Sequence, residues 1–349
     1  MTFQPDYKNI QDAAYNKAAA RLPLYEHLIS DKVMEDVLGK EFGHLFKGSQ
    51  REKEEYFTHF IDFYLKMGYD SVSFERCIGN IMPHSGLLMG HGASVINTYE
   101  DFEKYPWDEI EDLYFAANTP YFDALEKALP PGMKAIGGVG NGVFECIQDI
   151  IGYMNLAFIA SDDPVLYRAL FKKMGDVSLC IWKRFMARYG DMYCVLRFGD
   201  DLGFKTNTLL PAEDIRQLVV PEYAKIIAFI HSCNKPFLLH SCGYIFDVMP
   251  DMINVAKINA KHSNEDQIGL FPVWVEKYGA QIGNFGGIDT DAVCRLSPVE
   301  IKEYVKDVLK QCGQYENAGG IAFGSGNSIP EYVPAGHYVA MVEAVREWR

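Results

Sequence analysis

The segment from Met192 to Gly243 decides the predicted fold. It contains an apolar run, "MYCVLRFGDDLG" (192–203), a stretch of helical period, "PAEDIRQLVVPEYAKIIAFIHSC" (211–233), and a second apolar run, "KPFLLHSCG" (235–243). Short apolar runs that alternate with longer helical segments are typical of parallel β-strands joined by helical crossovers. We therefore predict a strand–helix–strand unit here.

The same alternation recurs along most of the chain. The other strand candidates are "YDSVSFERC" (69–77), "MKAIGGVGNGVFE" (133–145), "AKINAKHSNED" (256–266), "AQIGNFGGID" (280–289) and "GGIAFGSGN" (319–327). Seven candidates in one continuous region, with no G-x-G-x-x-G motif at the first turn, favour an α/β (β/α)8 TIM barrel over an open sheet. We predict an N-terminal helical extension over residues 1–67, ending in the amphipathic segment 49–68, and the barrel over residues 68–349. Together they form one structural domain.

Composition limits the classes of partner. The formal net charge of −14 argues against nucleic acid or an anionic membrane as a partner, since both require a basic surface. The sequence has no apolar run of membrane-spanning length, and its first residues lack the order of a signal peptide. We expect a cytoplasmic protein. Its eight scattered cysteines, without a CxxC pair, are read as buried small residues or metal ligands.

The triplet His-Ser-Cys occurs twice, at 231–233 and at 240–242. The first lies in the last turn of a predicted helix, where a histidine favours the helix dipole and needs no other role. The second ends a predicted strand, where side chains two residues apart face the same side, so that His240 and Cys242 can converge on one metal ion. The alternative is a buried histidine and a small buried cysteine.

Polar residues also follow the other predicted strands, and the carboxyl ends of barrel strands carry the chemistry of barrel enzymes. They are Glu75, Asp200, Asp201, His262, Glu265, Asp289 and Asn327. Carboxylate, imidazole and thiolate groups gathered at one mouth suit Zn²⁺. Each acid has an alternative role as a helix cap or ion-pair partner, and for Asp289 we weigh capping at least as heavily as catalysis.

These segments resemble one family. "FLLHSCG", "GDDLGFKTNTLLPAEDIRQLVVPEYAKII", "NFGGID" and the closing "GGIAFGSGNSIPEYVPAGHYVAMVEAVRE" are similar to the uroporphyrinogen decarboxylase (URO-D) superfamily. The resemblance runs from about Gly68 to the end of the chain and is strongest from Leu196. It implies a (β/α)8 barrel. The superfamily includes tetrapyrrole decarboxylases and zinc-dependent methyltransferases that work with corrinoid proteins.

The decarboxylase branch carries an arginine motif of the R-Q-A-G-R type near its N-terminus, which suits a substrate with many carboxylates. The corresponding region here reads "AAARLPLYEHLISDK" (18–32) and lacks that motif. The resemblance is therefore closer to the methyltransferase and O-demethylase branch.

The methyltransferase branch uses an H-x-C pair, a glutamate from the next unit and a cysteine in a G-C-x-I-P motif. His240 and Cys242 match the pair and Glu265 has a similar spacing to the glutamate, so the resemblance implies these three as zinc ligands. In the last motif Asn327 stands where the family has cysteine. A site with one thiolate would suit polarising an ether or alcohol oxygen better than activating a thiol. Cys294 remains open as a further ligand.

The resemblance therefore implies a methyltransferase that moves a methyl group from a small donor, such as an aromatic methyl ether, to a corrinoid protein. Glu75, Asp200 and Asp201 are candidate catalytic residues, and His262 and Asn327 candidate substrate-binding residues. One alternative is a metal-free lyase that decarboxylates another carboxylate. Another is a non-catalytic binder of corrinoids or tetrapyrroles. Analogy with the family also allows a homodimer.

Overall fold

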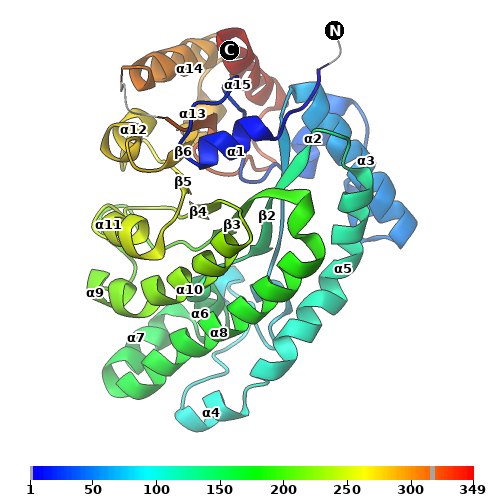
Figure 1. Ribbon diagram of the computed structural model, residues 1–349. Helices are drawn as coiled ribbons and strands as arrows, with labels where there is room; N and C mark the ends of the chain where they lie inside the picture. The colour runs from blue at the N-terminus through cyan, green and yellow to red at the C-terminus, as the bar shows by residue number, and fades with distance from the viewer. Residues whose placement is uncertain (1–2, 315–318) are drawn as a thin grey trace.

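A computed structural model describes residues 3–314 and 319–349 (Figure 1). Its sheet has seven strands, all parallel and in chain order. They are β1 (Ser71–Cys77), β2 (Lys134–Gly140), β3 (Tyr193–Gly199), β4 (Phe237–His240), β5 (Ala260–His262), β6 (Gly283–Ile288) and β7 (Ile321–Ser325). Each predicted run contains one of these strands, which confirms a TIM-barrel-like α/β fold.

Helices follow the strands and cover the outside of the sheet (Figure 1). Those up to β3 are α1 (Lys8–Ala14), α2 (Asp31–Leu38), α3 (Gln50–Met67), α4 (Tyr99–Lys104), α5 (Ile110–Ala128), α6 (Val143–Ile151), α7 (Tyr153–Asp162) and α8 (Pro164–Tyr189). Those after β3 are α9 (Ala212–Asp214), α10 (Val220–Ser232), α11 (Met249–Asp251), α12 (Phe271–Tyr278), α13 (Thr290–Arg295), α14 (Pro298–Cys312) and α15 (Ala335–Trp348).

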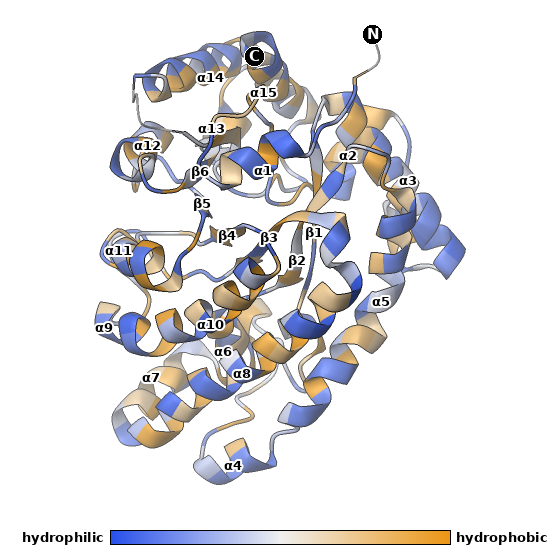
Figure 2. Ribbon diagram, viewed as in Figure 1, coloured by the Kyte–Doolittle hydropathy of each residue, from blue (hydrophilic) through white to orange (hydrophobic). Residues whose placement is uncertain are grey.

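Local sequence explains where these elements begin and end. Ser49 and Glu52 form a capping box at the start of α3, and Gly68 ends the helix with a left-handed φ of 84°. All seven residues of β3 are buried, as expected for a parallel strand covered on both faces. Helices such as α5 and α8 carry both hydrophobic and hydrophilic residues along their length (Figure 2), consistent with one face on the sheet and one in solvent.

An eighth strand is not among the elements found in residues 3–314 and 319–349. Residues 23–29 occupy that position instead: the backbone N–H of Tyr25 donates to the carbonyl of Phe323 in β7 at 3.0 Å. On the other side, the Ser73 hydroxyl of β1 donates to the carbonyl of Glu26. The pairing with β7 then stops, because the N–H of Ser325 donates to the Glu26 carboxylate at 3.1 Å rather than to a backbone carbonyl.

Helix α1 packs directly on the sheet. Ile10 and Ala13 of α1 belong to the same buried cluster as Val195 of β3 and Leu238 of β4. The carbonyl oxygen of Ala13 would lie 2.3 Å from a Cβ at Gly283, so that position requires glycine. Helix α1 thus covers the end of the barrel where the strands begin, and the carboxyl ends of the strands remain for a site.

Within the described ranges, no single helix has the length and apolar character that a membrane span requires. The bent pair α6 and α7, at 95° to each other, meets that test only when the two are taken together.

Candidate metal centre and its surroundings

The two His-Ser-Cys triplets lie at different ends of the barrel. His231 is in the last turn of α10, and its Nε2 is 2.6 Å from Oδ1 of Asn259, the residue before β5. His240 is the last residue of β4, and Cys242 follows two residues later. The second triplet therefore lies at the carboxyl ends of the strands, where barrel enzymes have their active sites.

His240 and Cys242 converge with Asp201, which lies two residues beyond β3. Sγ of Cys242 is 3.4 Å from Nε2 of His240, and that nitrogen is 3.9 Å from Oδ1 of Asp201. The three ligand atoms lie within 4.8 Å of one another. The backbone N–H of Cys242 donates to the same Asp201 oxygen at 2.8 Å, which holds the loops after β3 and β4 together.

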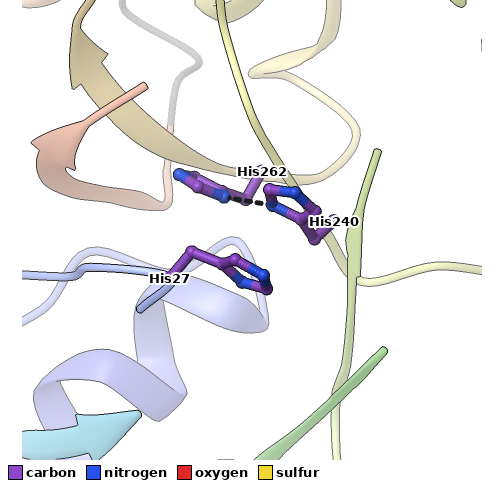
Figure 3. A group of neighbouring side chains, drawn as sticks. All are labelled: His27, His240 and His262. Carbon is purple, nitrogen blue, oxygen red and sulfur yellow. Dashed lines mark hydrogen bonds between the residues drawn. The ribbon is translucent and has the colours of Figure 1, made fainter. Parts of the chain in front are cut away.

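Hydrogen bonds behind His240 determine which of its nitrogens faces this group. Nε2 of the buried His262 lies 3.2 Å from the Ser325 carbonyl, which can only accept, so this nitrogen carries the proton. His262 Nδ1 is then an acceptor, 2.7 Å from Nδ1 of His240 (Figure 3). His240 donates through Nδ1, and its Nε2 lone pair is directed at Cys242 and Asp201. A hydrogen bond of this kind, on the ring nitrogen that does not face the metal, orients metal-bound histidines.

Burial favours the neutral forms of His240, His262 and Cys242 in the absence of a metal. It lowers the pKa of His240 well below its usual value and that of His262 to about 3. Burial, followed by the nearby Asp201 charge, raises the pKa of the Cys242 thiol. A bound cation reverses that effect, because a coordinating thiol loses its proton. The Cys242 sulfur also accepts hydrogen bonds from the Asn327 amide at 3.3 Å and the Ser263 hydroxyl at 3.6 Å.

His27, from the segment that lies beside β7, is a part of the site that the sequence did not indicate. Its ring stacks on that of His240 at 3.7 Å and 7° (Figure 3). With His262 these rings form a second group of possible ligands. A metal between His240 and His262 would, however, displace the hydrogen bond between their Nδ1 atoms. The group of Asp201, His240 and Cys242 is therefore the better candidate.

Glu75, at the carboxyl end of β1, faces the site from the opposite side. Its Oε2 accepts from Nε of Arg197 at 2.9 Å and lies 2.8 Å from Nη2 of the same guanidinium, and its Oε1 is 4.0 Å from Nε2 of His27. Arg197 is completely buried and also donates to the Tyr25 hydroxyl at 2.7 Å. The pair fixes the Glu75 carboxylate and balances its charge, with one oxygen directed toward His27.

The neighbouring acids Asp200 and Asp201 occupy different environments. Asp200 is fully buried, and its carboxylate accepts from the N–H groups of Phe144 and Glu145 at 2.9 and 2.8 Å and from the Tyr223 hydroxyl. These bonds place Asp200 at the start of α6. Burial raises its pKa to about 7. Asp201, by contrast, lines the cavity beside His240.

The carboxyl group of Glu145, the last residue of the strand candidate 133–145, is a second part of the site that the sequence did not indicate. It accepts from the Asn141 side chain at 2.7 Å and from the N–H of Asp201 at 3.2 Å. Burial raises its pKa well above the usual value, and the charges of Asp200 and Asp201 raise it further. A neutral carboxyl group therefore lies beside Asp201.

The site opens into a cavity of about 290 Å³. Its lining includes His27, Glu75, Cys77, Asn141, Glu145, Asp201, His240, Cys242, Asn327 and Ser328. Glu265 lies elsewhere, in an adjoining cavity of about 450 Å³ that shares Asn327 and Ser328. It is in neither ligand group found among the described residues.

The remaining strand-end candidates lie outside both ligand groups. The carboxylate of Asp289 accepts from the N–H groups of Asp291 and Asp266 at 2.7 and 2.8 Å, so it caps α13. Cys294 lies on α13, and it too is absent from both groups within the described ranges.

A solved structure of another protein has the same architecture. A methyltransferase from Methanosarcina mazei superposes with a TM-score of 0.78 at 16% identity, over 99% of each chain, and so shares the fold. A xylose isomerase-like TIM barrel protein from Mycobacterium smegmatis gives a TM-score of 0.43 at 9% identity, over 87% of this chain and 92% of that one. No curated protein matches. The family model for uroporphyrinogen decarboxylase (URO-D) matches residues 55–348, so the protein belongs to the uroporphyrinogen decarboxylase family.

Proposed function

We propose that the protein is a zinc-dependent methyltransferase that moves a methyl group between a small donor, such as an aromatic methyl ether, and a corrinoid protein. The convergence of Asp201, His240 and Cys242 at the mouth of the barrel carries this proposal. The shared fold with the Methanosarcina mazei methyltransferase is consistent with it.

The donor set fits Zn²⁺. At bond lengths near 2.0–2.3 Å, tetrahedral zinc holds nitrogen, sulfur and oxygen ligands roughly 3.3–3.6 Å apart. The observed separations of 3.4 Å and 3.9 Å are close to these values. The cavity of about 290 Å³ at this site leaves room for a donor molecule at a fourth position. Bound there, Zn²⁺ would act as a Lewis acid on the donor oxygen as the C–O bond breaks.

Other residues of the site suit the handling of protons and the positioning of the donor. Glu145 is kept protonated by burial and by its acidic neighbours, so it can supply a proton to a leaving alkoxide or phenoxide. Glu75 and His27 face the same cavity, and the Glu75 oxygen not bound by Arg197 can orient the donor. Asn327 takes the place of a second thiolate and donates to the Cys242 sulfur instead.

Exposed apolar side chains near the mouth support a protein partner. Met89, Met154, Phe158 and Phe204 are 61–77% exposed and lie in the segments that follow β1, β2 and β3. These segments contact one another: the Asn155 amide donates to Ser94 at 2.8 Å, and the Tyr153 hydroxyl donates to the Leu209 carbonyl at 2.6 Å. Apolar side chains exposed together at a site mark surfaces that bind partners.

Decarboxylation of a tetrapyrrole is less well supported. Arg21, from the N-terminal region without the arginine motif, is paired with Asp70, with Nε 3.1 Å from Oδ2. Arg197 is buried and paired with Glu75. Neither of these arginines is available to bind the carboxylates of such a substrate.

The first test is a pair of cysteine substitutions. Cys242→Ala removes a proposed thiolate ligand, so zinc content and methyl transfer to a corrinoid acceptor should both fall sharply while circular dichroism stays unchanged. The matched control is Cys233→Ala in the first triplet, which should cost on the order of 1 kcal/mol of stability and keep the zinc. Equal zinc content in both variants and the wild type, measured by elemental analysis, would contradict the proposal.

A further inference from the structure

A third cavity, of about 260 Å³, lies beside the 290 Å³ cavity at the proposed metal site, and the proposed function does not account for it. These two cavities share Leu28, Glu75 and Cys77 as lining residues. The third cavity, called the aromatic cavity below, extends from this shared wall outward between β1, α3 and the segment after His27. A ligand that reaches both cavities would therefore pass Glu75.

The walls of the aromatic cavity are formed by five aromatic side chains. The residues that form them are Phe46, Tyr56, Phe60, Tyr64 and Phe74. The rings support one another: those of Tyr56 and Phe60 stack 5.9 Å apart, and those of Phe46 and Tyr56 are 4.8 Å apart. A rigid lining of ring faces and edges suits a planar aromatic ligand, which packs well in offset or edge-to-face geometry.

One cation, Arg76, also lines this cavity. Its Nε donates to Oδ1 of Asn118 at 2.8 Å, and its guanidinium lies 4.5 Å from the ring centroid of Tyr121 and 5.4 Å from that of Phe46. These contacts hold the side chain in place but use one of its five N–H donors. Within residues 3–314 and 319–349 Arg76 makes no ion pair, unlike Arg21, Arg184, Arg188 and Arg197.

We propose that the methyl donor is an aromatic methyl ether that carries a carboxylate, with its ring in the aromatic cavity and its carboxylate paired with Arg76. A fixed guanidinium with free N–H groups is the group that recognises a carboxylate best. The ether end of such a ligand faces the shared wall at Glu75, whose charge is already balanced by Arg197 and does not repel the anion. This inference rests on the proposed function for the role of the ether group.

The test measures binding without any corrinoid partner. Isothermal titration of the zinc-loaded protein compares meta-methoxybenzoate, meta-hydroxybenzoate and the neutral methoxybenzene. The wild type should bind both acids at least about tenfold more tightly than methoxybenzene, as expected for a charged hydrogen bond. Arg76→Met should bring the acids down to the affinity of the neutral compound and leave that compound unaffected. Arg76→Lys, which keeps the charge but not the planar fork, should recover part of the difference.

The matched control is Arg184→Met. Arg184 also lies over an aromatic ring, 4.4 Å from the centroid of Phe115, but on the outer surface of α8 away from the cavity. It should bind all three compounds as the wild type does. Equal affinity of the wild type for acid and neutral compounds, or unchanged binding of the acids by a folded Arg76→Met protein, would overturn the inference. If Arg76→Met does not fold, the acid-to-neutral ratio of the wild type and of Arg76→Lys decides. Tight acid binding without methyl transfer would leave the carboxylate site standing and contradict the proposed function alone.

Discussion

The hydrogen bond between His240 and His262 links the interior of the barrel to the proposed metal centre. The Ser325 carbonyl determines the tautomer of His262, and His262 in turn determines that of His240. A histidine that orients a ligand in this way acts on metal affinity without touching the metal itself. His262 was a candidate substrate-binding residue in the sequence, but it is fully buried behind His240, where it suits a positioning role instead.

We expect His262→Phe to weaken zinc binding by about 10–100-fold, the usual effect of removing such a partner. Phenylalanine keeps much of the ring volume but offers no acceptor to the His240 Nδ1–H, so the imidazole can turn or change tautomer. Competition with a zinc chelator measures the affinity, and thermal unfolding of the metal-free protein serves as the control for folding. An unchanged zinc affinity in a folded His262→Phe protein would contradict this role.

For individual residues, the sequence predicts contacts that depend on strand geometry but not contacts that depend on closure of the barrel. Alternation along a strand brings His240 and Cys242 to the same side, and their ligand atoms are 3.4 Å apart. His27 had no such signal, because its place beside His240 depends on contacts between residues more than two hundred positions apart. Spacing similarly drew attention to Glu265, but the loop after β5 directs it into the adjoining cavity.

The segment 23–29 is fixed to β7 by a buried carboxyl group, that of Glu26. Glu26 is buried and accepts from both the N–H and the hydroxyl of Ser325 in β7. Burial raises the pKa of Glu26 from 4.5 to about 8, although the bonds from Ser325 act in the opposite direction. The folded state therefore favours the neutral carboxyl group.

This shift predicts a specific pH dependence of stability. Because the folded pKa lies above the unfolded one, the contribution of Glu26 is fully present below about pH 4.5 and is lost as the pH rises through about 8. Glu26→Gln is neutral throughout and keeps an oxygen for the Ser325 N–H. Between these pH values the wild type should lose stability relative to the variant, by at most about 1.4 kcal/mol per pH unit.

Urea unfolding of both proteins across this range measures the difference. Groups that titrate in both proteins cancel when the two curves are subtracted. Parallel curves for wild type and Glu26→Gln would show that Glu26 is already ionised in the folded protein.

Helix boundaries were less predictable than strands. The predicted helix over 211–233 is interrupted: α9 is followed by a π-helical turn, Ile215–Val219, before α10 begins. Pro221 explains part of this, since a proline is tolerated in the first turn of a helix and would remove a hydrogen bond farther in. The helical period of the apolar residues carries no information about such a turn.

For the whole molecule, the order of the strands was predictable and the closure of the barrel was not. Seven apolar runs, each followed by a helix, specify seven parallel strands in chain order, as observed. The closing segment 23–29 contains Pro23, Glu26 and His27 and shows no apolar alternation. It is held in place by β7, by Ser73 and by the Glu26 carboxylate, which are interactions with distant parts of the chain.

The last prediction concerns the exposed apolar side chains near the mouth of the barrel, Met89, Met154, Phe158 and Phe204, here called the apolar rim. The net charge of −14 is spread over the whole chain and does not by itself select a docking face, so we expect a corrinoid protein to be recognised through local contacts at the mouth. Phe158 of α7 is 61% exposed there, among Met89, Met154 and Phe204. Phe158→Glu should raise the KM for the corrinoid protein about tenfold, the effect of replacing one apolar interface contact by a charged side chain. It should leave zinc content and methyl transfer to free cobalamin unchanged.

Val255→Glu is the matched control, because Val255 is 52% exposed but precedes β5 at the opposite end of the barrel. It makes the same chemical change away from the mouth and should leave the KM for the corrinoid protein as it is. Steady-state kinetics with the protein-bound corrinoid and with free cobalamin separate partner docking from chemistry. If Phe158→Glu and Val255→Glu raise the KM equally, charge alone is responsible and the rim is not the docking surface. If Phe158→Glu lowers transfer to free cobalamin as well, Phe158 acts on the site itself rather than on the partner.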